Sequence, residues 1–257
     1  MKIYAMENGH IRIPLMPNAP DGTGKTISMP IPSYLIEHEE GYVLIDCGLS
    51  KYEPRAADGG FGSSETPSEE QTGCLRDLGV APEDIKYVIL SHLHADHCGY
   101  LASYKNAEIY IHEGEYRDII ESYKPGCLSR GYFDQDIEAF RSSGLNFKPV
   151  SGVCELRPFL PGIDIIVLGP GHASGMLGVM LHTRDHGNVI IAQDAADSRR
   201  SWGPPVILPG IMKSKEGFLR SVEYLRKLCD EYSATLIFGH DPEQFAKLKK
   251  HRDGYYE

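Results

Sequence analysis

The sequence predicts a mixed α/β fold that forms a single domain over residues 1–257. Short runs rich in β-branched residues alternate with helical patterns, and the order of elements in the first half returns in the second. A chain of this length, with 41% hydrophobic and 24% charged residues, can bury one large core. Periodicity alone gives this class and no particular topology.

The first half starts with strands and reaches its first helix after a Gly- and Ser-rich stretch at 58–67. We expect that helix to begin at Ser68, because Ser68-Glu-Glu-Gln71 has the spacing of a capping box, and to stop at Gly79. The strands are expected at residues 2–6, 33–37, 42–46 and 85–90.

The middle of the chain continues the alternation and contains an insertion. A helix is expected at 113–122, and the Gly-containing region 123–145 is predicted to carry a short helix at 135–141 and to form part of a pocket wall. Further strands are expected at 107–112, 146–150, 163–168, 175–183 and 188–193.

The last part of the chain is predicted to form two helices, one before and one after a strand at residues 234–238. Ser214 is expected to cap a long amphipathic helix. Its core face comprises Phe218, Leu219, Val222, Leu225 and Cys229. Asp241, followed by a proline, is expected to cap a final helix, and the basic run 247–252 is interpreted as its solvated face.

Three imidazoles and a carboxylate crowd into six positions directly after the strand 85–90. They belong to His92, His94, Asp96 and His97. Each buried imidazole without a partner costs free energy, so this density is explained most simply by a metal ion, which such nitrogens and oxygens bind well. The cluster predicts a metal site.

Three more metal-binding side chains follow the same local pattern. His172 stands in Gly169-Pro-Gly-His172, Asp194 ends the apolar run that starts at Val189, and His240 follows the strand that ends at Phe238. In each case an apolar run stops at a turn and presents the side chain at the end of a strand. We therefore expect four strand ends to meet at one rim.

With these residues the chain resembles the metallo-β-lactamase superfamily, whose H-x-H-x-D-H motif is matched by the cluster that starts at His92. Within it, the chain looks most like the N-acyl-homoserine lactonases, because of the run Pro30-Ile-Pro-Ser-Tyr, the Asp46-Cys-Gly turn and the closing Phe238-Gly-His-Asp. The resemblance implies the four-layer αβ/βα fold and opening of the lactone ring of N-acyl-homoserine lactones, which is quorum quenching.

The resemblance also implies two divalent metal ions, with zinc expected and iron, manganese or cobalt left open. It assigns His92, His94 and His172 to one ion, Asp96, His97 and His240 to the other, and Asp194 as the bridge. A metal-bridging hydroxide would attack the ring carbonyl, and Asp96 would relay the proton as the catalytic residue. A structural zinc site is disfavoured, because no cysteine lies at ligand spacing.

One position departs from the lactonase pattern. These lactonases carry a tyrosine three residues after the bridging aspartate, and here that position is Asp197. Either another donor replaces it or the substrate differs; the candidate donors are Tyr100, Tyr132 and Ser198. Trp202 could form a wall for an acyl tail or be structural. A glyoxalase-II-like thioesterase, a phosphodiesterase and a non-catalytic binding protein therefore remain alternatives to the lactonase.

The remaining features restrict partners and compartment. A net charge of −10 argues against nucleic acid, and no run of about 18 apolar residues or signal peptide is found. Six scattered cysteines predict reduced thiols and a cytoplasmic protein that acts on a small molecule, with oligomeric state open.

Smaller expectations concern single residues. Asp46 either orients a metal ligand or is a turn carboxylate, and Cys98 is expected to pack as a small residue. Six histidines are expected to be surface or satisfied residues: His10, His38, His112, His182, His186 and His251.

Overall fold

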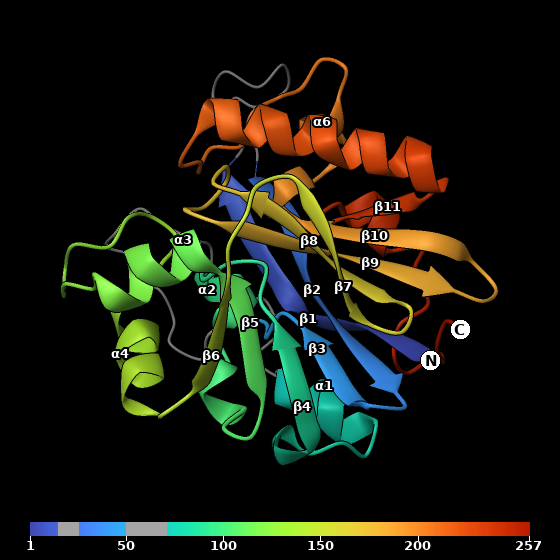
Figure 1. Ribbon diagram of the computed structural model, residues 1–257, viewed down its shortest axis with the longest axis horizontal. Coiled ribbons are helices and arrows are strands. Elements are labelled where there is room, and N and C mark those ends of the chain that lie inside the picture. The colour runs from blue at the N-terminus through green and yellow to red at the C-terminus, as the bar shows by residue number, and fades with distance from the viewer. Residues whose placement is uncertain (15–25, 50–70) are drawn as a thin grey trace.

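The computed structural model describes residues 1–14, 26–49 and 71–257, and it consists of two mixed β-sheets packed face to face (Figure 1). The capping box expected at Ser68 and the Gly- and Ser-rich stretch 58–67 lie outside the described residues. Among those that are described, no helix has the length and apolar character needed to cross a bilayer.

The first sheet has the order β1-β2-β3-β4-β5-β6. The first three strands pair antiparallel and the pairs from β3 to β6 are parallel. The bounds are β1 Lys2–Pro14, β2 Thr26–His38, β3 Gly41–Ile45, β4 Ile85–Ile89, β5 Glu108–His112 and β6 Asn146–Val150. The first hairpin is longer than expected, since β1 and β2 remain paired beyond an irregularity between Glu7 and His10.

The second sheet has the order β11-β10-β9-β8-β7, with a parallel pair only between β10 and β11. The bounds are β7 Glu155–Leu160, β8 Ile163–Gly169, β9 Met176–Thr183, β10 Gly187–Gln193 and β11 Thr235–Phe238. Strand β7 was not predicted. It is an edge strand with a proline at position 158, and its mixed polarity hides the period of two that marks a half-buried strand.

The helices lie on the outer faces of the two sheets (Figure 1). Helix α6, in orange, runs across the outer side of the second sheet, whereas α3 and α4, in green, lie beside the first. The α-helices are α1 Gln71–Asp77, α2 Ala95–Cys98, α3 Glu113–Glu115, α4 Asp134–Ser142, α5 Arg199–Trp202, α6 Lys215–Tyr232 and α7 Pro242–Phe245. The 3-10 turns are η2 Pro82–Asp84, η3 Leu101–Ser103 and η5 Asp194–Ala196, and η4 Tyr116–Glu121 is a π-helix.

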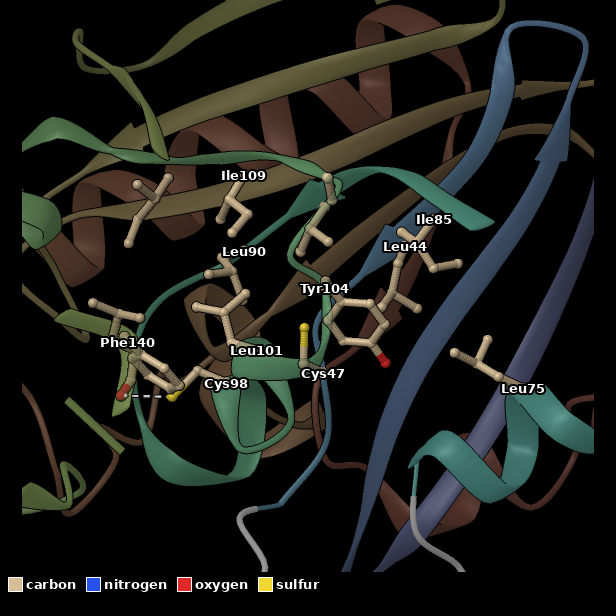
Figure 2. Close-up of a cluster of buried hydrophobic side chains, with 14 of the residues drawn as sticks. Leu44, Cys47, Leu75, Ile85, Leu90, Cys98, Leu101, Tyr104, Ile109 and Phe140 are labelled. Carbon is tan, nitrogen blue, oxygen red and sulfur yellow. Dashed lines mark hydrogen bonds between the residues drawn. The ribbon is translucent and has the colours of Figure 1, made fainter. Parts of the chain in front are cut away.

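Three layers of buried side chains confirm the predicted four-layer arrangement. Isoleucine, valine and leucine side chains of both sheets meet between them, for example Ile36 and Ile45 with Ile165 and Val179. The outer face of the first sheet packs on its helices, and Figure 2 shows Leu90 and Ile109 of this cluster. The outer face of the second sheet packs on α6.

Two helix predictions differ from the structure. The helix expected at 113–122 is a short α-turn followed by the π-helix η4, in which the adjacent residues Ile119 and Ile120 are both buried. The final helix ends at Phe245 and does not include the basic run 247–252. In that segment Lys250 instead forms a bridge to Ala5 on the free edge of β1, so main-chain pairing replaces helix there.

Candidate metal centre

The seven predicted ligands come together at the ends of four strands, as the sequence predicts. His92, His94, Asp96 and His97 follow β4, and α2 starts directly after His94. His172 follows β8, Asp194 follows β10 and His240 follows β11. Because β4 belongs to the first sheet and the other three strands to the second, the site lies across one edge of the sandwich. All seven side chains are buried.

Four of the seven form what we call the three-histidine group: His92, His94, His172 and Asp194. Nδ1 of His94 lies 2.8 Å from Nε2 of His92 and 2.9 Å from Nε2 of His172. Nε2 of His172 is 3.0 Å from Oδ2 of Asp194. Three ring nitrogens and one carboxylate oxygen therefore surround a single point.

The other three form the Asp96 group: Asp96, His97 and His240. The two Nε2 atoms lie 3.2 Å apart, and Oδ2 of Asp96 is 3.6 Å from that of His97 and 3.5 Å from that of His240. Oδ1 of Asp194 reaches this group, at 2.9 Å from Nε2 of His240. One carboxylate thus contributes an oxygen to each group.

These separations fit the donor set of a divalent cation. Metal–ligand bonds of about 2.0–2.1 Å place adjacent ligand atoms of a tetrahedron about 3.3 Å apart. The distances above, from 2.8 to 3.6 Å, scatter around that value. Without a cation or a shared proton, such close nitrogen lone pairs would repel one another, so the residues present fit a metal in each group.

Hydrogen bonds on the far side of three rings leave Nε2 as the lone-pair nitrogen. Nδ1 of His97 donates to Oδ2 of Asp46 at 2.7 Å, and Nδ1 of His240 donates to the carbonyl oxygen of Pro30 at 2.8 Å. The hydroxyl of Ser91 donates its proton to Asp46, so at 3.0 Å it accepts from Nδ1 of His92. Such partners fix the tautomer and the orientation of a metal-binding imidazole.

Asp46 connects the site to both sheets. Besides His97, its carboxylate accepts from the backbone N–H and hydroxyl of Ser91 and from Nε2 of Gln193, at 2.6–2.8 Å. Asp46 follows β3 and Gln193 ends β10, and both have a positive φ, 58° and 47°. Backbone of this kind persists only where its surroundings enforce it, and it is frequent at functional sites. Of the two readings of Asp46, the orienting one is therefore supported by its contacts.

The charges of the metal-free site are complementary. Burial, followed by the neighbouring imidazoles, lowers the pKa of His92 and of His94. Burial would also lower the pKa of His240, but the carboxylates of Asp194 and Asp96 raise it to about 9. Two neutral rings are therefore ready to bind a cation, whereas His240 must release a proton when one enters.

Two glycines allow the backbone to approach the ligands closely. A Cβ at position 131 would lie 2.5 Å from Cδ2 of the His94 ring, and φ there is 102°. A Cβ at position 239 would lie 2.8 Å from Oδ1 of Asp194. Both positions therefore require glycine for a steric reason that belongs to the site.

The predicted replacements for the family tyrosine are mostly engaged elsewhere. The Tyr132 hydroxyl donates to Glu115 at 2.9 Å, and that of Ser198 donates to Asp197 at 3.3 Å. Tyr100 packs against the core cluster outside the first sheet. Asp197 is half-buried, and its carbonyl accepts from the His240 backbone N–H at 2.7 Å; burial, and then the charge of Asp194, raises its carboxyl pKa.

Other singled-out residues do not join the site. The Trp202 ring packs against Phe238 and under the Arg226 guanidinium, which supports its structural reading. Cys98 is buried, and its thiol donates to the Leu93 carbonyl. Neither metal group contains any of the six other histidines; His251, which was placed in a solvated basic run, is in fact buried.

The sequence interpretation missed two side chains that support the ligands, Gln193 and Glu115. The amide of Gln193 reaches Asp46, and the buried Glu115 carboxyl accepts from the Leu93 N–H, between two ligands. A glutamate in the first turn of an expected helix gives no sign of burial. Only the packing of distant segments reveals it.

The fold and the site together define a metal-dependent enzyme with a His/Asp centre at one edge of a two-sheet sandwich. The chain belongs to the metallo-beta-lactamase superfamily, whose sequence profile matches residues 29–240. N-acyl homoserine lactonase AiiB of Agrobacterium fabrum is 31% identical over all of this chain and 99% of its own length. N-acyl homoserine lactonase AttM of Azorhizobium caulinodans is 30% identical, with the same coverage.

Solved structures agree with these relatives. A quorum-quenching N-acyl homoserine lactone hydrolase superimposes with a TM-score of 0.81 at 25% identity, over 98% of this chain and 97% of that one. An N-acyl homoserine lactone hydrolase with N-hexanoyl-L-homoserine at its catalytic metal centre gives a TM-score of 0.82 at 24% identity and supports the fold.

Proposed function

We propose that this protein is an N-acyl homoserine lactonase that uses two divalent metal ions, zinc in the first place. The observation that carries the proposal is the convergence of seven buried His and Asp side chains into two groups that share Asp194. Its whole-chain relatives are lactonases of this class, which favours a lactone over a thioester or a phosphodiester. The six scattered cysteines, which form no disulfide among the described residues, are in keeping with a reducing cytoplasm.

The reaction adds water to the lactone carbonyl and breaks the ring C–O bond, leaving a carboxylate and a hydroxyl group. When bound, the ions supply an activated water and polarise the carbonyl. The three-histidine group and the Asp96 group would hold one ion each, with Asp194 contributing to both.

Asp96 is the residue that we assign to proton transfer. Its Oδ2 faces His97 and His240, which leaves Oδ1 to take the proton of the attacking water and to deliver it to the ring oxygen as that bond breaks. Asp46 accepts a hydrogen bond from Nδ1 of His97 and so keeps this imidazole, which neighbours Asp96, in place during the transfer.

The test uses the purified zinc-loaded protein and N-acyl homoserine lactones with short and long acyl chains. Hydrolysis is measured through the proton that the newly formed acid releases. The expected result is turnover that stops on chelation and returns with zinc. A matched panel contains a glutathione thioester and bis-p-nitrophenyl phosphate. Turnover of either of these without any lactone opening would contradict the proposal, and so would lactone opening that persists without metal.

A further inference from the structure

Glu115 is a fully buried carboxyl group that lies outside the seven ligands and has no part in the proposed chemistry. It belongs to α3, directly after β5, on a different segment from every ligand. Burial raises its pKa to about 7, and the Leu93 N–H, the Tyr132 hydroxyl and the Ser174 and Gly175 backbone amides oppose that rise. Burying an ionisable group in this way costs free energy, so the contacts of Glu115 must stabilise something that offsets this cost.

The first contact reaches the metal-binding motif itself. Oε1 of Glu115 accepts from the backbone N–H of Leu93 at 3.1 Å. Leu93 lies between two ligands, His92 and His94, so this hydrogen bond fixes the peptide that sets the spacing of their rings.

The second contact reaches the ring of His94. The same Oε1 atom accepts from the Tyr132 hydroxyl at 2.9 Å. The Tyr132 ring lies edge-on to that of His94, with centroids 4.5 Å apart. The adjacent Gly131 carbonyl also accepts from the Ala95 backbone N–H at 2.9 Å. Glu115 therefore holds the side chain that covers His94.

The third contact reaches the loop of His172. The turn that carries Glu115 lies against Ser174 and Gly175, two and three residues after this ligand. The close approach is visible at Gly114, where a Cβ would lie 2.6 Å from the Ser174 carbonyl oxygen. The same is seen at Gly175, where a Cβ would lie 2.0 Å from Nδ1 of His112. This loop is thus seated directly on the turn that carries Glu115.

We propose that Glu115 is a positioning residue for the three-histidine group, since its carboxyl binds the segment of His92 and His94 and the tyrosine that covers His94, while its turn seats the loop of His172. The rings of the Asp96 group are held instead by Asp46 and the Pro30 carbonyl. The inference rests on the proposed metal-dependent function and deepens it.

The test compares zinc affinity at the two groups in Glu115→Gln and the wild type. Glutamine keeps the size but removes the negative charge, which weakens the hydrogen bonds that the Leu93 N–H and the Tyr132 hydroxyl donate to this side chain. Zinc per chain is measured across a series of free zinc concentrations set by a competing chelator, and anomalous scattering locates the ion that remains.

We expect one ion of Glu115→Gln to bind about 10–100-fold more weakly, the range for loss of a residue that orients metal ligands. It should be the ion of the three-histidine group, with the other unchanged, and excess zinc should restore lactone opening. Tyr132→Phe, which keeps the ring and removes one hydrogen bond, should show a smaller effect on the same ion. Asp164→Asn is the matched control and should leave both ions unchanged, because the Asp164 carboxylate binds His182 and no candidate ligand.

Three outcomes contradict the inference. Wild-type zinc affinity at both groups in Glu115→Gln would overturn this inference and leave the proposed function intact. Equal weakening of both, with a matching loss of stability in the metal-free chain, would show a general structural role instead. A wild-type chain that binds no zinc would overturn the proposed function and, with it, this inference.

Discussion

At the scale of single residues, the centre depends on which nitrogen of each imidazole is left without a proton. Nδ1 of His97 donates to Asp46 and Nδ1 of His240 donates to the Pro30 carbonyl, so that their Nε2 atoms face each other at 3.2 Å. In the metal-free chain this arrangement is held by protons and nearby carboxylates. A metal ion would replace those protons, so affinity should rise with pH.

Asp46→Asn tests the support of the Asp96 group. The amide of asparagine cannot accept from all of its donors, which include His97, Ser91 and Gln193, so the His97 ring should lose its fixed orientation. We expect zinc affinity at the Asp96 group to fall about 10–100-fold, measured by chelator competition. Asp164→Asn is the matched control. Oδ2 of Asp164 lies 2.8 Å from Nε2 of His182, and this pair is outside the site. Unchanged affinity in Asp46→Asn would refute this role.

Glu115 predicts a specific pH dependence of stability. Its pKa is about 7 in the folded chain against 4.5 for a free side chain, so the folded state keeps a proton that the unfolded state has lost between these values. The free energy of unfolding contributed by this group therefore falls as pH rises from about 4.5 to about 7. In urea unfolding of metal-free protein, this fall should be smaller in Glu115→Gln. Parallel curves for the two proteins would contradict the assignment.

The convergence of the seven candidate ligands was predictable residue by residue, whereas the side chains that support them were not. The short cluster from His92 to His97 announces itself by density, and His172 and His240 by their place at strand ends. Glu115 and Gln193 carry no such sign, because their role arises from contacts with Leu93 and Asp46 on other segments. Tertiary packing, which a local pattern does not contain, decides these roles.

At the scale of elements, strand ends and short turns place the ligands. Strands β4, β8, β10 and β11 each stop one to three residues before a ligand, and α2 then directs Asp96 and His97 together. These strands were predictable because their runs of β-branched residues are clear in the sequence. Strand β7 and the π-helix η4 were not, since their polarity follows neither the strand period nor the helix period.

The segment 123–133 is predicted to hold His94 by direct backbone contact. In Gly131→Ala, the new Cβ would lie 2.5 Å from the His94 ring, and φ of 102° is strained for alanine. We expect one zinc ion fewer per chain and loss of most lactone opening. Gly126→Ala is the control, because φ there is 73° but a Cβ meets nothing within 4 Å. A similar loss in both variants would mean that backbone strain alone is responsible.

At the scale of the whole molecule, the site joins the two sheets. One ligand cluster follows β4 of the first sheet, and the remaining ligands follow strands of the second. The core between the sheets is apolar and holds them without metal, as Ile45 and Ile191 illustrate. Composition and alternation were enough to predict a mixed α/β class, whereas the four-layer sandwich and the metal centre required the motif and the family resemblance that it carries.

Metal removal is predicted to destabilise the whole fold. Because the ions would bind only the folded arrangement, each adds about 4 kcal/mol to the free energy of unfolding when free metal is 1,000 times its Kd. Chelation should therefore lower Tm, and added zinc should restore it. The measurement is thermal unfolding by circular dichroism with and without chelator. A Tm that does not respond to either would contradict a site that spans both sheets.

The most direct test of the account is anomalous diffraction at the zinc edge from crystals of the zinc-loaded protein. We predict two strong peaks within one buried site, one bounded by His92, His94 and His172, the other by Asp96, His97 and His240, with a carboxylate oxygen of Asp194 beside each. A single peak, or peaks away from these side chains, would contradict it.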